Sequence, residues 1–263
     1  RAHVNFTTQL SRTYSLMAGY RNDLYNYDQS GAGSFSALLD RVEHRVTANL
    51  RSQLRPGTTG ILGYQHRVVD YTSDDSLSFN RYRSPEERNS DSDYVYAGFD
   101  HSFTPELLGS LRAGAQFTSY DNVAAGVDDS TTSPYIDANL SYAYAKGSNI
   151  AVGLRHERNQ TDIAQVGGSL ILDQETTSAY ASVSHQLTAK LTANFVGMYA
   201  NSSFGDSLAD TSDNFWSLGF NMSYQINQYL LAETGYNFDD LDSDLGNRSF
   251  DRNRVYLGLK ASY

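Results

Sequence analysis

The chain has 263 residues, no cysteine, 4 prolines and a formal net charge of −10 at pH 7. The acidic balance argues against a nucleic-acid partner, because such partners require clustered basic charge. No stretch approaches the roughly 20 consecutive apolar residues that a membrane-spanning helix needs, so hydropathy alone would class the chain as soluble.

The composition points to a different class. Tyrosine and glycine are abundant, at 20 residues each, while proline is scarce. Strands that are apolar on one face and polar on the other average to a polar composition. A membrane barrel with a wet interior has that average, because only its outer face meets lipid.

A period of two residues recurs along the whole chain and predicts strands. It is clearest over residues 41–54, where Val42 and Val46 fall on one face and Arg41 and Arg45 on the other. A helix would mix these two sets on every side, whereas a strand separates them. The segment is also long enough to cross a bilayer as a tilted strand of about 10 residues.

Segments of this kind are separated alternately by short turns and by longer polar stretches. We identify thirteen, which begin near Ala2, Tyr14, Asp40, Thr59, Asp93, Leu108, Ser133, Asn149, Thr176, Leu191, Asn214, Tyr229 and Asp251. The longer connections cover residues 29–36, 73–91, 122–132, 164–173, 207–213 and 239–249, and contain most of the carboxylate clusters. Short periplasmic turns alternating with long external loops are typical of outer-membrane barrels. The sequence thus predicts one all-β domain over residues 1–263, a transmembrane antiparallel up-and-down barrel of about 12–14 strands.

An odd number of strands conflicts with the even count of bacterial single-chain barrels, whose two termini are periplasmic. The last segment follows a long connection and therefore runs towards the periplasm. The first segment precedes a short turn and runs the same way, which places Arg1 on the outer rim. We therefore expect one further strand upstream of Arg1, which would give about 14.

The C-terminal segment carries a resemblance to known proteins. Its ending is similar to the C-terminal strand signal of outer-membrane proteins, which the barrel-assembly machinery reads; the resemblance assigns that role to Leu257, Leu259, Ala261 and Tyr263. The wider sequence FDRNRVYLGLKASY, residues 250–263, resembles the end of a β-barrel porin family encoded near exopolysaccharide and exosortase loci. This resemblance implies a porin-like barrel in the outer membrane of a Gram-negative bacterium, in contact with lipid and lipopolysaccharide.

Charged residues dominate the polar faces of the predicted strands. The candidate lumen-lining residues are Arg41, Arg45, Arg51, Arg67, Arg112, Arg155, Glu157, Glu233, Arg254 and Lys260. One interpretation is a charged lumen that selects anionic solutes or sugar polymers, since rings of fixed charge bias permeation. The alternative, which we favour, is a ladder of ion pairs that braces the wall.

Two further patterns suggest sites, each beside a simpler interpretation. Tyr94, Tyr96, Tyr180 and Tyr256 fall on inward faces and could stack sugars, although interface girdles explain most tyrosines of a barrel. Asp240, Asp242 and Asp244 alternate as hard-cation ligands can. Their spacing misses the EF-hand pattern, so a solvated acidic loop is favoured and no metal or other cofactor is expected.

Catalysis is the weakest possibility, since the six histidines lie mostly on the lipid-facing register or near strand ends and no GxSxG motif occurs. We expect no catalytic residue and no enzyme activity. The best hypothesis is a porin-like channel for exopolysaccharide or for small anionic or sugar solutes. The alternatives are a plugged structural or docking barrel that binds a secretion or polysaccharide partner, including a sheath for an electron conduit, and an outer-membrane hydrolase. The sequence does not fix the oligomeric state.

Overall fold

A computed structural model describes residues 1–123, 128–166, 169–204 and 211–262. The long strands are β1 (Ala2–Gln9), β2 (Tyr14–Tyr25), β3 (Arg41–Arg55), β4 (Thr58–Tyr71), β5 (Ser90–Ser102), β6 (Leu107–Tyr120), β7 (Ser130–Ala145), β8 (Ser148–Asn159), β11 (Gln174–Gln186), β12 (Leu191–Ser203), β13 (Ser212–Asn227), β14 (Leu230–Ser243) and β15 (Phe250–Ala261). The connections contain helix α1 (Phe35–Leu39), the 3-10 helix η1 (Pro85–Arg88) and the short pair β9 (Gln165–Val166) and β10 (Ser169–Leu170).

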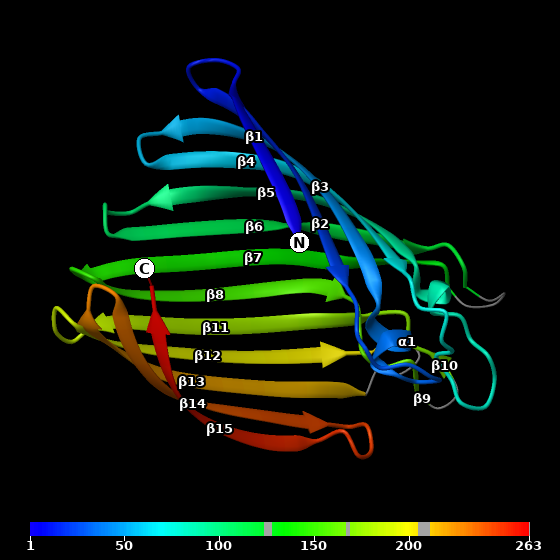
Figure 1. Cartoon of the computed structure of the whole chain (residues 1–263). Coiled ribbons are helices and arrows are strands. Elements are labelled where there is room, and N and C mark those ends of the chain that lie inside the picture. Colours follow the sequence, from blue (N-terminus) through cyan, green and yellow to red (C-terminus); the bar gives the residue numbers. More distant parts are fainter. Residues whose placement is uncertain (124–127, 167–168, 205–210, 263) are drawn as a thin grey trace.

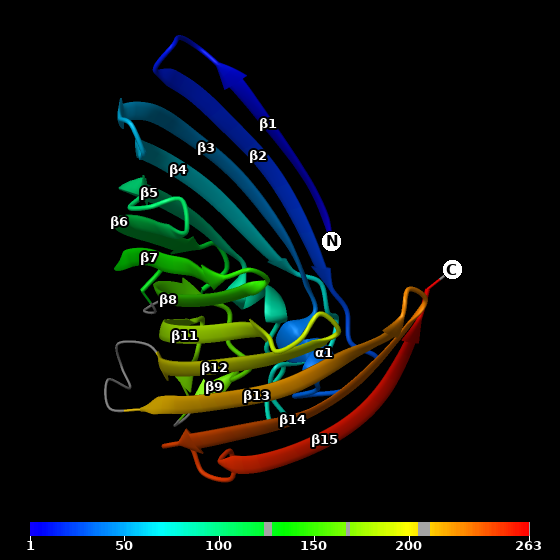
Figure 2. The same cartoon turned by 90° about the vertical axis from the view of Figure 1, so that its left-hand side faces the viewer.

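The thirteen long strands form one antiparallel up-and-down sheet in chain order (Figure 1). Every strand begins within about three residues of the predicted position, so the fold class is confirmed. The sheet curls into a barrel-like shape whose two edges, β1 and β15, face each other across a gap (Figure 2). No ladder joins these edges among the described residues, and the expected fourteenth strand stays a prediction.

The acidic stretch before the last strand differs from the prediction. Residues 239–243 belong to β14 and not to a loop, because β14 pairs with β13 as far as Asp213↔Ser243 and with β15 as far as Leu241↔Phe250. An acidic residue is tolerated in this strand because Asp239 accepts hydrogen bonds from Arg252 and Arg254 of β15.

The convex face of the sheet is apolar. On β15 the outward side chains include Leu257, which is 84% exposed, and β8 and β13 present Val152 and Leu218 on the same face. Such a continuous apolar surface is unfavourable in water and suits lipid. It follows directly from the alternation in the sequence, since successive side chains of a strand point to opposite faces.

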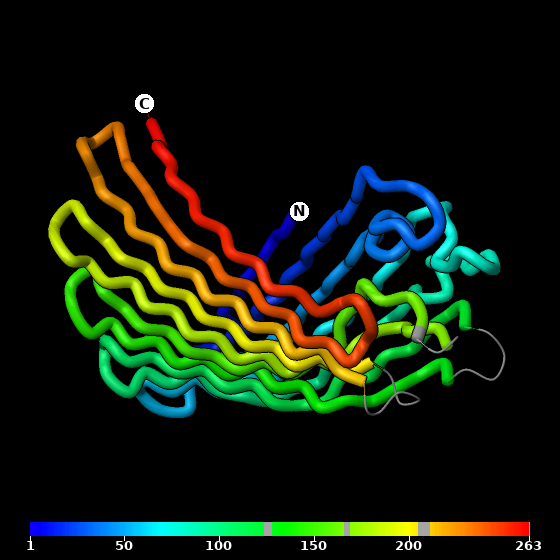
Figure 3. Tube along the Cα trace, turned by 90° about the horizontal axis from the view of Figure 1, so that it is seen from below, coloured from blue at the N-terminus to red at the C-terminus, as the bar shows by residue number. Residues whose placement is uncertain are grey.

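At the end of the sheet where the long connections gather, which we call the long-loop end, chain folds back into the concave interior. Figures 2 and 3 show α1 and the loop that carries β9 and β10 on that side of the sheet. Buried Ile163, Ile171 and Phe204 form a small apolar cluster there, against which Leu245 packs. Neither helix in the described part of the chain has the length and apolarity to cross a membrane.

Candidate pore lining

Contacts between strands that are not neighbours identify the concave face as an enclosed polar surface. Tyr96 of β5 donates to Asn49 Oδ1 of β3 over 2.8 Å, across the intervening β4. Arg67 of β4 donates through Nη2 to the carbonyl oxygen of Arg158 on β8, at 2.9 Å. Strands β4 and β8 are separated in the sheet by β5, β6 and β7, so these two residues can meet only across the concave side.

Ion pairs run along this face from strand to strand. Arg51 Nη2 and Arg112 Nη2 both donate to Asp100, over 2.9 and 2.8 Å. Arg155 pairs with Asp137 and lies 3.7 Å from Glu157. A buried or half-buried charge is costly unless it is paired, and these networks satisfy most of the guanidinium groups in the wall.

The ten predicted lumen-lining residues all occupy concave-facing register positions, but they differ in what they contact. Arg112, Arg155 and Arg254 bind carboxylates of neighbouring strands, and Glu157 accepts the longer contact from Arg155. Arg41 binds Glu43 of its own strand, and Arg51 binds Asp100 across β4. Glu233 lies against Gly258. Arg45 and Lys260 have no carboxylate partner in the described ranges, whereas Arg67 is buried and binds a carbonyl. The concave wall therefore combines a network of ion pairs with a few cationic side chains, those of Arg45, Arg67 and Lys260, that are not part of this network.

Three strand triplets repeat one arrangement of asparagine, glycine and tyrosine. In β3, β4 and β5, Asn49 pairs with Gly63, which pairs with Tyr96, and the tyrosine hydroxyl bonds back to the asparagine. A Cβ on Gly63 would overlap the Tyr96 ring. The ring therefore lies flat over the glycine, a close approach that only a residue without a side chain permits.

The same arrangement occurs twice more, and again each of three consecutive strands contributes one residue. The two sets are Asn139–Gly153–Tyr180 on β7, β8 and β11, and Asn221–Gly235–Tyr256 on β13, β14 and β15. In each set the asparagine Nδ2 donates to the tyrosine hydroxyl. Each triplet ties three strands together across the concave face, so these glycines have a packing role in the wall.

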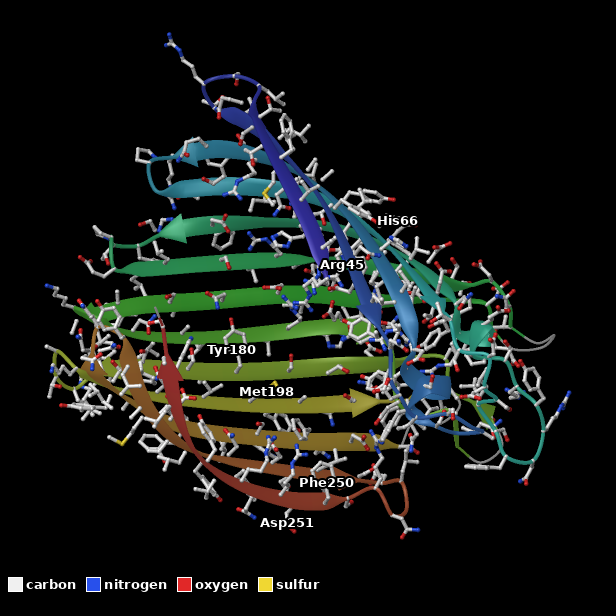
Figure 4. The ribbon with its side chains drawn as sticks, viewed as in Figure 1. Arg45, His66, Tyr180, Met198, Phe250 and Asp251 are labelled. Atoms are coloured by element: carbon white, nitrogen blue, oxygen red, sulfur yellow. The ribbon has the colours of Figure 1, made fainter. Side chains whose placement is uncertain are left out.

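The four inward tyrosines of the predicted sugar track do not form a continuous surface. Tyr94 and Tyr96 are buried against Tyr135 and Ile61. Tyr180 and Tyr256 remain about 40% exposed, on β11 and β15. Figure 4, which looks into the interior, shows Tyr180 on the wall formed by the middle strands. Only these last two rings present an open face.

A buried arginine that the sequence did not single out joins three chain segments at the long-loop end. Arg88 of η1, only 1% exposed, donates to the carbonyl oxygens of Leu38 (3.0 Å), Leu172 (3.4 Å) and Thr161. It also lies over the Tyr71 ring. The sequence Ser84-Pro85 is a recognisable helix start, but nothing local shows that the arginine after it enters the barrel. We call this set of contacts the Arg88 clamp.

Two more groups of polar contacts, around Asp173 and around Arg248, hold the infolded loops. Arg158 and the Tyr120 hydroxyl both donate to buried Asp173. Burial raises the pKa of this carboxyl above its ordinary value, although both partners oppose the shift. Arg248 binds Asp162 through both Nη atoms (3.0 and 2.7 Å) and Asp213 through Nε (2.8 Å). These bonds outweigh burial and raise the Arg248 pKa.

The acidic candidate for a cation site is dispersed in the structure. Asp240 and Asp242 lie in β14, and Asp244 accepts hydrogen bonds from the backbone and hydroxyl of Ser212. Across the described ranges, no group of three or more potential ligands is arranged to hold a metal ion.

Most histidines lie on the convex face and bind hydroxyl or carboxylate groups there. His44 contacts the Tyr20 hydroxyl, His66 contacts Asp93, and His156 contacts Glu175, each over 2.8 to 2.9 Å. The absence of a catalytic site stays a prediction, because a channel-like fold does not exclude one.

The predicted assembly signal occupies the free edge of the sheet. Leu257 and Leu259 point outwards from β15 and are largely exposed, and Ala261 is its last residue. Tyr263 lies outside the described residues. The assembly role of these residues stays a prediction.

The two-faced sheet and its charged interior agree with what comparison with known proteins finds. A family model described as Putative beta-barrel porin 2 matches residues 4–263. The chain belongs to this family. Membership confirms the resemblance seen in the C-terminal sequence and supports an outer-membrane channel in general terms.

Comparison with solved structures finds transport proteins, among them a copper transporter and a porin. The Copper transporter OprC is similar over 99% of this chain and 51% of its own, with a TM-score of 0.60 and 11% identity. This member of the Putative beta-barrel porin 2 family thus spans about half the length of OprC. The NanC porin aligns over 94% of this chain and 99% of its own, with a TM-score of 0.39 and 10% identity. Comparison with curated proteins gave no match.

Proposed function

We propose that the chain forms a selective pore for small polar solutes in the outer membrane of a Gram-negative bacterium. The observation that carries this proposal is the division of the sheet into an apolar convex face and a charged concave face. A wall with fixed charges and hydroxyl groups suits a water-filled passage. Membership of a porin family supports the same function. Lipid and lipopolysaccharide outside the barrel, and the barrel-assembly machinery during insertion, are the partners that this location implies.

Small solutes fit the interior better than a polymer does. The Arg88 clamp, the apolar cluster around Phe204 and the Arg248 ion pairs all lie at the long-loop end, where they narrow the passage. An exopolysaccharide chain would have to displace these buried contacts, whereas a single sugar or a small acid would have to pass only beside them.

Single-channel recording in planar lipid bilayers tests the proposal. The purified full chain should give discrete conductance steps in potassium chloride, and the reversal potential in a salt gradient should report ion selectivity. Absence of conductance at every voltage, from protein shown to be folded by its heat-modifiable mobility in electrophoresis, would overturn the pore function.

A second candidate is a plugged barrel whose loops bind a partner. The infolded α1 and the β9–β10 loop favour it, because a buried arginine that satisfies three carbonyl groups is a stable closure. In this case the wild-type chain would give no conductance, and removal of the Arg88 clamp would create it.

A further inference from the structure

Basic side chains lie in one row across the first four strands. The register pairs His3 of β1 with Arg21 of β2, Arg21 with Arg45 of β3, and Arg45 with Arg67 of β4. All four positions face the concave side. Like charges placed directly opposite on neighbouring strands destabilise a sheet, so such a row calls for negative charge to neutralise it.

The carboxylates near this row are already engaged. Asp23 accepts from both Arg1 Nε and Arg21 Nε, each over 2.6 Å. Glu43 accepts from Arg41 Nε over 2.8 Å. Two guanidinium groups of the row, those of Arg45 and Arg67, therefore lack a carboxylate partner within the described residues.

Arg67 differs from Arg45, because it lies in the electrostatic field of Glu43, Glu157 and Asp173 although it forms an ion pair with none of them. Its side chain is 3% exposed, and its Nη2 is directed to a carbonyl oxygen. Its Nε is buried and has no hydrogen-bond partner in the described part of the chain. A buried donor without a partner costs free energy, and a charged one more so. The row thus ends in a buried cation with a free donor.

A hollow of about 400 Å³ lies over the other end of the row. Its lining includes His3, Arg21 and Arg45, together with the side chains of Asn5, Thr47 and Gln65. A few hundred Å³ is the size of a small-molecule site. Arginine is suited to planar oxyanions because it offers paired donors, while the amides and the hydroxyl can bond sugar-like hydroxyl groups. Figure 4 labels Arg45 within this interior.

We propose that the hollow lined by His3, Arg21 and Arg45 is an oxyanion-binding site for a small hydroxylated acid, with Arg45 as the principal contact. The anionic group, a carboxylate or a phosphate, pairs with the Arg45 guanidinium, which forms no ion pair within the described residues. This inference deepens the proposed pore function by naming the class of solute, and the placement of the site rests on that function. Binding itself does not require the pore to be open.

Isothermal titration calorimetry on the full chain in detergent micelles tests the site. The probes are D-glucuronate, glucose 6-phosphate and glucose, which share a sugar ring and differ in the anionic group. Wild type should bind the first two and not glucose. Arg45→Gln should weaken binding by at least roughly 10-fold, the effect of losing one charged hydrogen bond. Arg45→Lys should restore part of the affinity, because it keeps the charge but not the paired donors.

Arg252→Gln is the matched control, since it removes a concave arginine that pairs with Asp239 on β14, away from the row. It should leave the affinities unchanged. The proposal would be overturned if Arg252→Gln and Arg45→Gln lost equal affinity for the anionic probes. It would also be overturned if wild type bound glucose and glucuronate equally well. If Arg45→Gln weakens the binding of only one anionic probe, the site takes that probe's anionic group, a carboxylate or a phosphate.

Should Arg45→Gln fail to fold, the salt dependence of glucuronate binding by wild type decides, because a charge-based site weakens as potassium chloride rises. Salt-independent binding would contradict the proposal. Conductance is measured separately, so the two proposals can fail independently. A protein that binds glucuronate but gives no conductance would contradict the pore function and support the binding site. A protein that conducts but does not bind glucuronate would support the pore function and contradict the binding site.

Discussion

Replacing Arg88 should open the long-loop end of the barrel. Arg88→Met keeps the length of the side chain but removes all its donors, leaving the buried carbonyl oxygens of Leu38, Thr161 and Leu172 without this partner. A hydrogen bond to a charged group contributes about 1.5–3 kcal/mol. Because one of the three bonds is long, at 3.4 Å, we expect a combined loss of about 3–5 kcal/mol, confined to the loops.

Hydrogen–deuterium exchange measures this loss directly. A local loss of about 3 kcal/mol corresponds to exchange on the order of 100-fold faster. We expect this in residues 160–165, in residues 169–173 and near α1, while the long strands keep their protection. The control Arg83→Gln removes an arginine from the same connection, but its pair with Glu87 is 3.6 Å long and solvent-accessible, so its effect should stay below about 1 kcal/mol. Unchanged exchange in Arg88→Met, or equal changes in both variants, would refute the reasoning.

Two further predictions concern the wall itself. Gly63→Val should lower the free energy of unfolding by about 1–3 kcal/mol, because the added side chain overpacks against Tyr96. The effect would be seen as a lower urea midpoint for unfolding from lipid vesicles. Gly246→Ala is the control, since a Cβ there meets nothing, and equal midpoints of the two variants would contradict the packing role. Leu218→Arg on the convex face should lower the free energy of unfolding by about 2–4 kcal/mol for a position near the bilayer centre. Ser182→Arg on the concave face should lower it much less. Equal losses would contradict the assignment of lipid to the convex face and water to the concave face.

The period-two alternation was sufficient to predict the strands and their faces. Segment 41–54 separates its valines from its arginines, and the structure extends this strand by a single residue, to Arg55. Burial of one face and hydration of the other impose this pattern locally, and it can therefore be read without knowing which strands are neighbours.

Contacts across the interior could not be predicted in this way. Asn49, Gly63 and Tyr96 lie on three strands, and only the register reveals that they form one unit. Arg88 occupies a connection that looks like an ordinary charged loop, because its burial depends on chain segments far away in sequence. The acidic run that begins at Asp239 was wrongly assigned to a loop, because its local composition is typical of loops. The ion pair with Arg252 on the next strand, which allows Asp239 to lie in a strand, is not visible in the local sequence.

The central claim is that water lies on the concave face and lipid on the convex face. Since the chain has no cysteine, single cysteines can be placed along β13 and probed in lipid vesicles with a membrane-impermeant maleimide. We predict rapid labelling at Ser217 and Ser223, which face inwards, and protection at Trp216, Leu218 and Phe220, which face outwards. Labelling that ignores this alternation, or that is reversed, would contradict the account.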